Sequence, residues 1–329
     1  MDQTKDQPVK SRRNPEEKDA VVVDILLVSY NTAAYTLKAL TSVYEQTQAV
    51  KFNIIVVDNN SSDDSVQQIK HHFPNITLIA SDKNLGFAGG VNLAASYSKG
   101  DYILLLNPDT EILDHAIDRL LQFAQEQPQY GIWGGITLNN DHSVNSHNAW
   151  SEDSITTLLL SSLGLNRIFK KSCFFNQANY GCWQRDSVKV VDILQGSFFL
   201  TTKSLWNQLK GLDERFFMYA EEADYCYRAK QLAYQPIITP TAKIIHHGGG
   251  SEKNLSGKMI RLLRGKVTFM NKHHTVWRRS IMKVLLFTYI SHKLILSLLL
   301  APINAHKRIQ NKEWWIVFKN SKTWLRGYQ

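Results

Sequence analysis

The sequence predicts an α/β fold with a basic, mostly helical C-terminal extension, and two observations support this. Short β-branched apolar runs alternate with helical segments over the first third of the chain, and the charge is divided unevenly. Residues 1–252 hold 22 basic and 28 acidic residues (−6), whereas residues 253–329 hold 16 basic residues and 1 acidic residue (+15). We therefore predict a disordered segment over 1–20, an α/β body over 21–252 and a separate basic extension.

The body is expected to start with alternating strands and helices. We place strands at 21–28, 52–57, 77–80 and 102–106, and helices at 34–46, 62–72 and 88–98. Ser62 or Asp63 is expected to cap the second helix. Short apolar strands separated by helices predict a parallel, doubly wound sheet. In such sheets ligands bind beyond the carboxyl ends of the strands, so the residues after each strand are candidates for a site.

The composition excludes several classes of protein. Hydrophobic residues at 43% and charged residues at 20% are ordinary globular values, which exclude a wholly disordered chain or a polytopic membrane protein. Three cysteines are too few for a disulfide scaffold and favour a reducing compartment. Residues 1–20 carry ten charges and no apolar run, so they resemble a disordered segment and lack the core of a secretory signal. We therefore expect a cytoplasmic protein.

Two common nucleotide-binding motifs are missing. No glycine occurs between the first predicted strand and Gly86, so the GxGxxG fingerprint of dinucleotide-binding proteins is absent, and there is no GxxxxGK[ST] loop. The polar residues at the strand ends are instead Asn31, Asp58, Asn107 and Asp109. Two carboxylates at successive strand ends suit a contact to a base and a contact to a metal.

Asp58 directly follows four apolar residues. Its carboxylate is placed to accept the N3–H of a uracil or thymine ring, and the alternative is an Asx-turn that closes the strand end.

Further along, three glycines lie in the five positions Gly86–Gly90 before a helix. Glycines there allow backbone amides to approach a phosphate or sugar, and the alternative is a tight turn only.

Asp109 follows the apolar strand 103–106 and suits a hard divalent ion bound to a diphosphate. Asn107 is placed to hold a ribose or a bound water. The alternative for Asp109 is an N-cap of a helix beginning near Glu111. His246, after a short β pattern, is a second metal ligand in this hypothesis; adjacent side chains of a strand point opposite ways, so His247 would not join it.

The segment Gly211–Arg228 has the highest density of charged and aromatic residues. On a helix that begins near residue 220, Glu221, Asp224 and Arg228 share one face, and Glu222 is turned about 100° away. Asp224 and Arg228 form a structural i, i+4 pair. Glu222 is our candidate for a catalytic base, although carboxylates in a first helical turn also suit the helix dipole alone.

With these motifs in order, the chain resembles the inverting family 2 glycosyltransferases of the A-type fold. Within them it is similar to the rhamnosyltransferase-like group that builds bacterial cell-surface polysaccharides such as O-antigen. The resemblance covers about residues 21–251 and implies a Rossmann-like nucleotide-diphospho-sugar transferase fold, with 21–252 as the catalytic domain. It rests on Ser29–Asn31, Val56–Ser61, Asn84–Asn92, Asn107–Asp109, Gly211–Arg228 and His246–Ser251.

The resemblance implies roles for individual residues. Asp58 contacts the pyrimidine base, Asp109 and His246 bind Mg²⁺ or Mn²⁺ with the donor diphosphate, and Glu222 deprotonates the acceptor hydroxyl. The implied donor and nucleotide contacts are Tyr30, Asn31, Asp58, Asn84, Gly86, Phe87, Asn92 and Asn107; the supporting residues are Glu221, Asp224 and Arg228.

Two positions depart from the wider family. Its Asp-x-Asp metal motif is here Asn107-x-Asp109, as is usual in the rhamnosyltransferase-like group, so one carboxylate instead of two reaches the metal. Its Glu-Asp pair is Glu221–Glu222, one methylene longer at the base. Glutamate is still a competent base, so the assignment of Glu222 is kept.

The implied reaction is a direct displacement at the anomeric carbon, with inversion. We expect L-rhamnose to move from dTDP-L-rhamnose to a lipid-linked saccharide. The alternatives are a UDP-sugar donor, or a non-catalytic subunit that binds nucleotide-sugar or polysaccharide and is recruited to the membrane.

The extension is predicted to bind an anionic membrane surface. Lys258, Arg261, Arg264 and Lys266 have mostly helical spacing, and the apolar stretch 281–305 is broken at Lys283 and at His292-Lys293. Its longest run without these residues, Leu294–Ala305, is twelve residues, whereas a bilayer needs about 20. We expect an interfacial helix pair that makes the protein peripheral on the inner face of the plasma membrane. The alternative is a helical subdomain packed on the body; no nucleic-acid motif supports an RNA partner.

Overall fold

The computed structural model describes residues 21–248, 254–300 and 305–329. The segment predicted to be disordered, 1–20, lies outside the described residues, as do Gly249 to Ser251 of the histidine-glycine motif and part of the apolar stretch 281–305.

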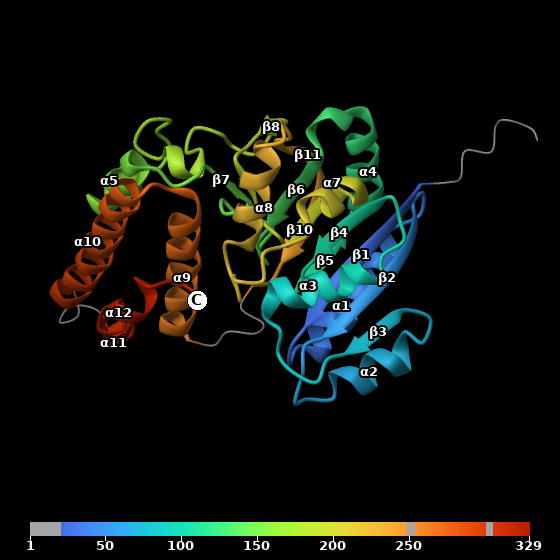
Figure 1. Ribbon diagram of the computed structural model, residues 1–329. Helices are drawn as coiled ribbons and strands as arrows, with labels where there is room; N and C mark the ends of the chain where they lie inside the picture. Colours follow the sequence, from blue (N-terminus) through green and yellow to red (C-terminus); the bar gives the residue numbers. More distant parts are fainter. Residues whose placement is uncertain (1–20, 249–253, 301–304) are drawn as a thin grey trace, which may run out of the picture.

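A nine-stranded mixed sheet forms the centre of the body (Figure 1), in the order β3-β2-β1-β4-β10-β6-β11-β5, with β8 paired to β11. The strands are β1 (Val22–Ser29), β2 (Lys51–Asp58), β3 (Thr77–Ala80), β4 (Tyr102–Leu106), β5 (Thr110–Leu113), β6 (Ile132–Leu138), β8 (Lys189–Val190), β10 (Phe198–Thr202) and β11 (Pro236–His246). β1 to β4 are parallel, but β10 runs antiparallel to both β4 and β6. The prediction of a parallel sheet is therefore wrong beyond β4.

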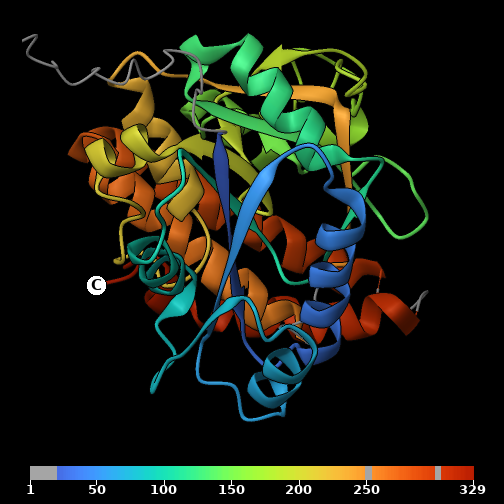
Figure 2. The same cartoon turned by 90° about the vertical axis from the view of Figure 1, so that its right-hand side faces the viewer.

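Helices cover both faces of the sheet (Figures 1 and 2). On one face lie α1 (Ala33–Gln46), α2 (Ser65–His72) and α4 (Ala116–Glu126); on the other lie α3 (Gly86–Ser96), α7 (Lys203–Leu209) and α8 (Glu221–Lys230). In β1, Ile25 and Leu27 pack into the first layer and Leu26 and Val28 into the second. Because both faces are buried, the strands are apolar at nearly every position.

Two predicted helix starts are wrong. The helix expected to follow a cap at Ser62 or Asp63 begins at Ser65, with Asp64 in the N-cap position, and the Asp63 carboxylate accepts the Ser65 N–H at 3.1 Å. The segment after Asp109 is the strand β5, which pairs with β11, and α4 begins at Ala116. Asp109 is therefore not a helix N-cap. β5 alternates between buried and partly buried residues and pairs with β11, about 130 residues further along the chain. A local sequence pattern does not reveal this partner strand.

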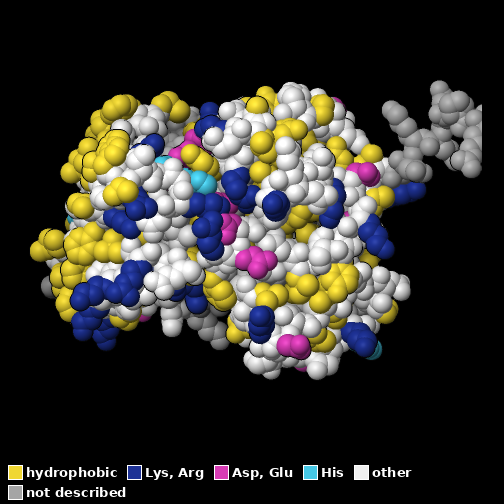
Figure 3. Space-filling model, in the orientation of Figure 1, with side chains coloured by type: hydrophobic (Ala, Val, Ile, Leu, Met, Phe, Trp, Pro, Cys, Tyr) yellow, Lys and Arg dark blue, Asp and Glu magenta, His cyan; other side chains and the backbone are white. Residues whose placement is uncertain are grey.

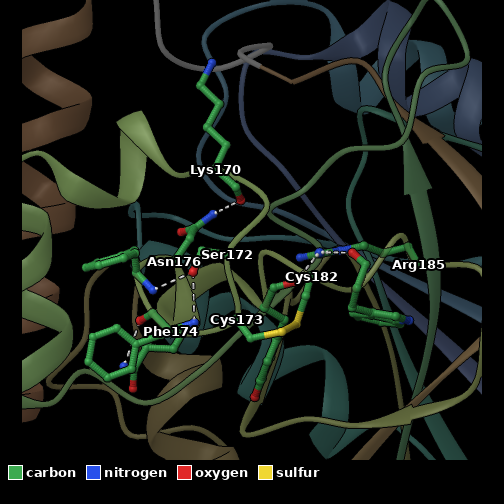
Figure 4. The surroundings of a disulfide bond; sticks show 11 residues. Lys170, Ser172, Cys173, Phe174, Asn176, Cys182 and Arg185 are labelled. Carbon is green, nitrogen blue, oxygen red and sulfur yellow. Dashed lines mark hydrogen bonds between the residues drawn. A yellow bond between two sulfur atoms is a disulfide. The ribbon is translucent and has the colours of Figure 1, made fainter.

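A long insertion separates β6 from β10. Its elements are β7 (Ala149–Trp150), α5 (Ile155–Ser162), α6 (Leu165–Ile168), a 3₁₀ turn (Gln177–Asn179), β8 and β9 (Ile193–Leu194). Contrary to the expectation of a chain without a disulfide framework, Cys173 and Cys182 are bonded here (Figure 4). Arg185 lies beside them and donates hydrogen bonds to several backbone carbonyls, including Asn179 O at 2.8 Å and Ser146 O at 2.8 Å.

The extension forms a helical unit with its own apolar core. It consists of α9 (Leu255–His273), α10 (Val276–Leu300), α11 (Ala305–Lys319) and α12 (Ser321–Trp324). Leu158 of α5 joins this core, and His292 of α10 contacts Ser162 O at 2.8 Å, so the unit packs on the body. His292 and Lys293, which interrupt the apolar stretch in the sequence, do not interrupt the helix: α10 continues through both residues, and Lys293 is buried near the rings of Tyr289 and Trp314.

Among the described residues, α10 alone is long and apolar enough to cross a membrane, judged by length and composition. Only 28% of its most apolar window is buried. The twelve-residue run in the sequence is therefore shorter than the apolar helix, which is 25 residues long.

Candidate active site

The strand-end residues gather at one edge of the sheet, as predicted. β1 and β2 are parallel and in register, so Ser29 lies opposite Asp58 at their carboxyl ends. β4 ends beside them, and the Asn107 N–H donates to Ser197 O at 3.2 Å, which ties the end of β4 to the start of β10. This edge combines the residues predicted for the nucleotide and for the metal.

Asp58 has one engaged and one unengaged carboxylate oxygen. The side chain is 2% exposed, and Oδ2 accepts the Ser61 N–H at 2.9 Å, which is the Asx-turn of the structural alternative. Oδ1 is enclosed and has no hydrogen-bond partner among the residues that the structure describes. A buried carboxylate oxygen without a partner is costly unless a ligand supplies a donor. Asp58 can therefore close the strand end and accept a hydrogen bond from a base at the same time.

Asn31 joins the end of β1 to the loop after β2. Its backbone is left-handed, with a φ of 52°, a region that asparagine tolerates better than most residues. Its Oδ1 accepts the Ser62 N–H at 2.7 Å, and its own N–H donates to Ser61 Oγ at 2.9 Å. The neighbouring Tyr30 is 38% exposed. Asn31 thus shapes the edge of the sheet where the nucleotide was predicted to bind, and Tyr30 is partly exposed beside it.

Asn59 is a residue that sequence reasoning missed. Its Nδ2 donates to Asn84 Oδ1 at 3.1 Å and to Gly86 O at 3.0 Å, and its Oδ1 accepts the Leu85 N–H at 2.8 Å. Asn84 also accepts the Gly86 N–H at 2.9 Å. These bonds fix the turn that precedes α3. The two asparagines are 25 residues apart, so only their types, and not their contact, are visible in the sequence.

Gly86 has a structural reason to be glycine. Its φ is +72°, and a Cβ there would lie 2.3 Å from Phe217 O. The next residue, Phe87, donates its N–H to the same oxygen at 2.8 Å. The start of α3 is therefore packed against the turn before α8. Asn92, further along α3, engages the same segment through bonds to Leu212 N and O at 2.9 and 2.8 Å.

Asp109, in the turn between β4 and β5, and His246, at the end of β11, are 137 residues apart in the sequence and adjacent in the structure. Asp109 Oδ1 lies 3.0 Å from His246 Nε2, and both side chains are largely buried. Asn107 Nδ2 lies 3.4 Å from the same nitrogen, and Asn107 Oδ1 is enclosed without a partner. His247 points elsewhere, toward Asn140 and Glu111, as the strand geometry predicts.

Gln195 connects this pair to the proposed base. Its Nε2 lies 3.4 Å from His246 Nδ1, and its Oε1 is enclosed without a partner. The following residue, Gly196, faces Glu222 and Phe87: a Cβ there would lie 3.8 Å from Glu222 Cβ and 3.7 Å from the Phe87 ring. Gln195 was absent from the prediction, because it lies in a short connection without a recognisable motif.

Glu222 is held at the start of α8 by an unusual turn. Tyr219 and Ala220 have φ angles of 71° and 72°, two successive left-handed residues that are not glycine. Such backbone is costly and is held only by surrounding contacts. Glu222 Oε2 is enclosed without a partner, and burial raises the pKa of Glu222 to about 7. Burial, together with the charge of Glu222, also raises the pKa of Glu221 well above its ordinary value.

Asp224 anchors the extension to α8. It is fully buried and accepts from Arg228 Nε at 2.7 Å, from Lys272 Nζ at 2.5 Å and from His273 Nε2 at 2.7 Å. Burial opposes ionisation, but the hydrogen bond from His273, the positive charge of Arg228 and the bond from Lys272 hold the pKa of Asp224 below its ordinary value. The predicted supporting pair is therefore one part of a larger network that includes α9.

α9 and the C-terminal segment also contact the left-handed turn. A Cβ on Gly265 would lie 2.3 Å from Tyr219 O, so the two backbones touch at a position where any side chain would collide. Tyr328 Oη donates to Met218 O at 2.9 Å. These contacts come from the extension, and they agree with the alternative of a helical subdomain packed on the body. The extension thus supports the turn that carries Glu222.

The fold is that of an A-type glycosyltransferase. Its mixed sheet carries an enclosed carboxylate oxygen on Asp58 and a carboxylate–imidazole pair, and an acid of raised pKa lies at the start of α8. The chain belongs to glycosyltransferase family 2, because the model of the family described as "Glycosyl transferase family 2" matches residues 24–188, half of the sequence. The predicted family and fold are confirmed.

Characterised relatives support a transferase of this kind. The N-acetylglucosaminyl-diphospho-decaprenol L-rhamnosyltransferase of Mycobacterium tuberculosis is 24% identical over 274 residues, which cover 79% of this chain and 87% of that protein. Rhamnosyltransferase WbbL of Escherichia coli K12 is 27% identical over 254 residues, which cover 73% and 89%. The chain is thus similar to rhamnosyltransferases along most of its length.

A solved structure shows the same fold. The mannosyltransferase PcManGT from Pyrobaculum calidifontis, in complex with GDP-Man and Mn²⁺, superimposes with a TM-score of 0.55 at 13% identity, over 94% of this chain and 84% of that one.

Proposed function

We propose that the protein is an inverting glycosyltransferase that moves L-rhamnose from dTDP-L-rhamnose to a lipid-linked saccharide. One observation carries the proposal: the Gln195-Gly196 dipeptide has the Asp109–His246 pair on one side and Glu222 on the other. Inverting transfer needs an acceptor base and a charge-neutralising group for the departing diphosphate, placed around one anomeric carbon. The two halves of the site meet this requirement.

Glu222 is the base in this proposal. Its pKa of about 7 allows it to be ionised at neutral pH and still accept a proton readily from a sugar hydroxyl. The unpartnered Oε2 is the atom that takes the proton. General-base catalysis by a positioned side chain contributes about 10²- to 10⁴-fold.

Asp109, His246 and Asn107 fit a divalent ion. One carboxylate, one imidazole and one amide side chain converge, and Asn107 Oδ1 has no hydrogen-bond partner among the described residues. Mg²⁺ and Mn²⁺ accept oxygen ligands of this kind and keep places for phosphate and water. The ion would act as a Lewis acid toward the departing nucleoside diphosphate. Among the described residues no group of three His, Cys, Asp or Glu side chains surrounds a metal, so the diphosphate itself would complete the coordination.

Asp58 is the proposed contact for the thymine base of the donor. The enclosed Oδ1 accepts one hydrogen bond, which matches the N3–H that uracil and thymine share. Asp58 would therefore accept dTDP and UDP donors alike. The Mycobacterium tuberculosis relative, named as an N-acetylglucosaminyl-diphospho-decaprenol L-rhamnosyltransferase, favours L-rhamnose as the transferred sugar and a lipid-diphosphate saccharide as the acceptor.

The donor and reaction are tested by a screen of the purified protein. dTDP-L-rhamnose and several UDP-sugars are offered with a lipid-diphosphate saccharide and Mg²⁺ or Mn²⁺, and nucleoside diphosphate release is followed. We expect release from dTDP-L-rhamnose that depends on acceptor and metal, with a product whose anomeric configuration is opposite to that of the donor. Retention of configuration would contradict the proposal, and the absence of release from every donor would favour a binding subunit.

We also propose that the enzyme is peripheral on the cytoplasmic face of the membrane. α10 buries one side in the extension and exposes apolar residues on the other at three- and four-residue steps, including Trp277, Ile281 and Val284 at 63%, 42% and 64% exposure. Exposed apolar side chains of α5 and the segment after it lie on the same side of the molecule (Figure 3). Lysines such as Lys319 lie nearby, over the ring of Trp315. An apolar face with basic neighbours suits an anionic lipid surface.

A further inference from the structure

A small cavity lies between the extension and the turn that precedes Glu222. It is lined by Phe217, Arg261, Arg264 and Tyr328 and has a volume of about 360 Å³. Arg261 and Arg264 are three residues apart on α9 and therefore lie on one face of that helix. The described lining therefore includes two guanidinium groups. Both belong to the extension, whose formal charge is +15, whereas the body has a formal charge of −6.

The cavity walls are held in place by the C-terminal segment. The Arg264 guanidinium lies 4.3 Å from the centre of the Tyr328 ring, and Arg264 Nε donates to Gly327 O at 3.4 Å. Tyr328 is itself fixed, since its N–H donates to Thr268 Oγ1 at 2.7 Å and its hydroxyl to Met218 O at 2.9 Å. Stacking on an aromatic ring orients a guanidinium and leaves its outer N–H groups directed away from the ring.

We propose that Arg261 and Arg264 bind the diphosphate of the lipid-linked acceptor. Paired guanidinium groups match phosphate oxygens in both charge and geometry. This inference rests on the proposed function, because it names the part of the acceptor that this enzyme holds away from the reacting hydroxyl. Phe217, which is 38% exposed, gives the cavity an apolar wall suited to the first part of a lipid chain.

The position relative to the base supports an acceptor site. Met218, whose carbonyl accepts from Tyr328, is four residues before Glu222, a reach of at most about 14 Å for extended backbone. The saccharide of a lipid-diphosphate acceptor lies between its diphosphate and its reacting hydroxyl, so a separation of this order is required. α9 then continues into α10, whose exposed apolar side is the proposed membrane surface.

The donor diphosphate is assigned elsewhere. The nucleotide and metal residues at the strand ends, from Asn31 to His246, do not line the cavity. Phe217 lies between the cavity and Gly86, because a Cβ on Gly86 would be 2.8 Å from the Phe217 ring. A diphosphate in this cavity is therefore distinct from the one beside Asp109.

The inference is tested by binding and by transfer in parallel. Farnesyl diphosphate is the probe for the proposed site and dTDP with Mg²⁺ is the probe for the donor site. For the Arg261→Gln/Arg264→Gln double variant we expect farnesyl diphosphate affinity to fall by more than about tenfold, with dTDP affinity and thermal melting unchanged. The matched control is Lys258→Gln, on the exposed part of α9, which should bind both probes normally. The Arg261→Lys/Arg264→Lys variant, which keeps the charge, should recover part of the affinity.

Transfer assays separate this inference from the proposed function. With farnesyl-diphospho-N-acetylglucosamine as acceptor, the double variant should show a raised KM, whereas with octyl N-acetylglucosaminide, which lacks a diphosphate, its KM should equal that of the wild type. Unchanged farnesyl diphosphate affinity, or an equal loss of dTDP affinity, would overturn the acceptor-diphosphate site even if transfer proceeds. If the wild type transfers no sugar but binds farnesyl diphosphate through the arginines, the proposed function fails and the diphosphate site stands.

Discussion

At the scale of single residues, the environment of Glu222 differs from that of an ordinary surface acid. It follows two left-handed residues, one carboxylate oxygen is enclosed without a partner, and burial raises its pKa to about 7. A carboxylate with a raised pKa is protonated over a wider acidic range than a free glutamate, and the protonated form cannot act as a base.

We therefore predict that kcat/KM falls as the pH drops below about 7, by about tenfold per pH unit. The sign follows from the raised pKa, because only the ionised form, which predominates above that value, accepts the proton. A pH profile measured at saturating metal, with dTDP affinity followed over the same range as a control, checks this. A rate that stays constant down to pH 5 would contradict the assignment of a base with this pKa.

The strand-end residues were predictable from the sequence, and their supporting contacts were not. Asp58 and Asp109 follow apolar strands, and the carboxyl ends of parallel strands meet at one edge of a sheet. No sequence pattern indicates the roles of Asn59 and Gln195, because these roles depend on contacts made only in the folded chain. A local pattern shows which side chains lie at an edge but not which of them touch.

At the scale of elements, α9 is the feature whose role differs most from expectation. The sequence indicated a basic helix for a membrane, but α9 also touches the turn at Tyr219 and neutralises Asp224. The short strand β5 was missed for a related reason: its pairing partner, β11, lies far along the chain. In both cases the tertiary partner, and not the local sequence, decides what the segment does.

Gly265 tests the contact between α9 and the turn. We predict that Gly265→Val lowers kcat by at least about tenfold while dTDP still binds, because a side chain would displace Tyr219 and move Glu222. The control is Gly257→Ala on the same helix, where the new Cβ would meet only Arg261 at 3.8 Å. Removing a helical glycine there should stabilise the protein by up to about 1 kcal/mol. Steady-state kinetics and melting curves of both variants measure these effects. A normal kcat in Gly265→Val would show that the contact between α9 and Tyr219 does not position Glu222.

Substitution of Asp224 tests how much its ion pairs with α9 stabilise the attachment of the extension to α8. We predict that Asp224→Asn lowers the free energy of unfolding at neutral pH by about 3 to 5 kcal/mol, since it leaves buried cations without their counter-charge. Because the folded-state pKa of Asp224 is lowered, the stabilisation is present above the unfolded pKa near 3.8 and is lost as the pH falls through the folded value.

The difference between Asp224→Asn and the wild type should thus narrow in acid, which denaturant titrations at pH 7 and pH 3 measure. The control, Lys230→Met, breaks the exposed pair with Asp192 and should cost less than about 1 kcal/mol. An equally small effect of Asp224→Asn would contradict the proposed attachment.

At the scale of the whole molecule, the +9 net charge is divided between a negative body and a positive extension. The extension has two sides in the structure, one packed on the body through α5 and α8, and one exposed and apolar along α10. Removing the extension would therefore also remove the support for Glu222. Membrane binding is better tested by point substitutions on the exposed side.

We predict that the double variant Trp277→Glu/Val284→Glu no longer sediments with vesicles that contain anionic lipid, while its melting temperature stays close to that of the wild type. The two side chains are 63% and 64% exposed, so their replacement removes apolar contact with lipid without opening the core. Val144→Glu, at a 44% exposed position of the body, is the control and should sediment normally. Equal sedimentation of the wild type and the double variant would contradict a membrane surface on α10.

The measurement that tests the central claim most directly is single-turnover transfer by Glu222→Gln with dTDP-L-rhamnose and a lipid-diphosphate saccharide. Glutamine keeps the shape of the side chain but cannot accept the hydroxyl proton. We predict a protein that folds, binds dTDP with wild-type affinity and transfers sugar about 10² to 10⁴ times more slowly than the wild type. Transfer at the wild-type rate would contradict the assignment of Glu222 as the base.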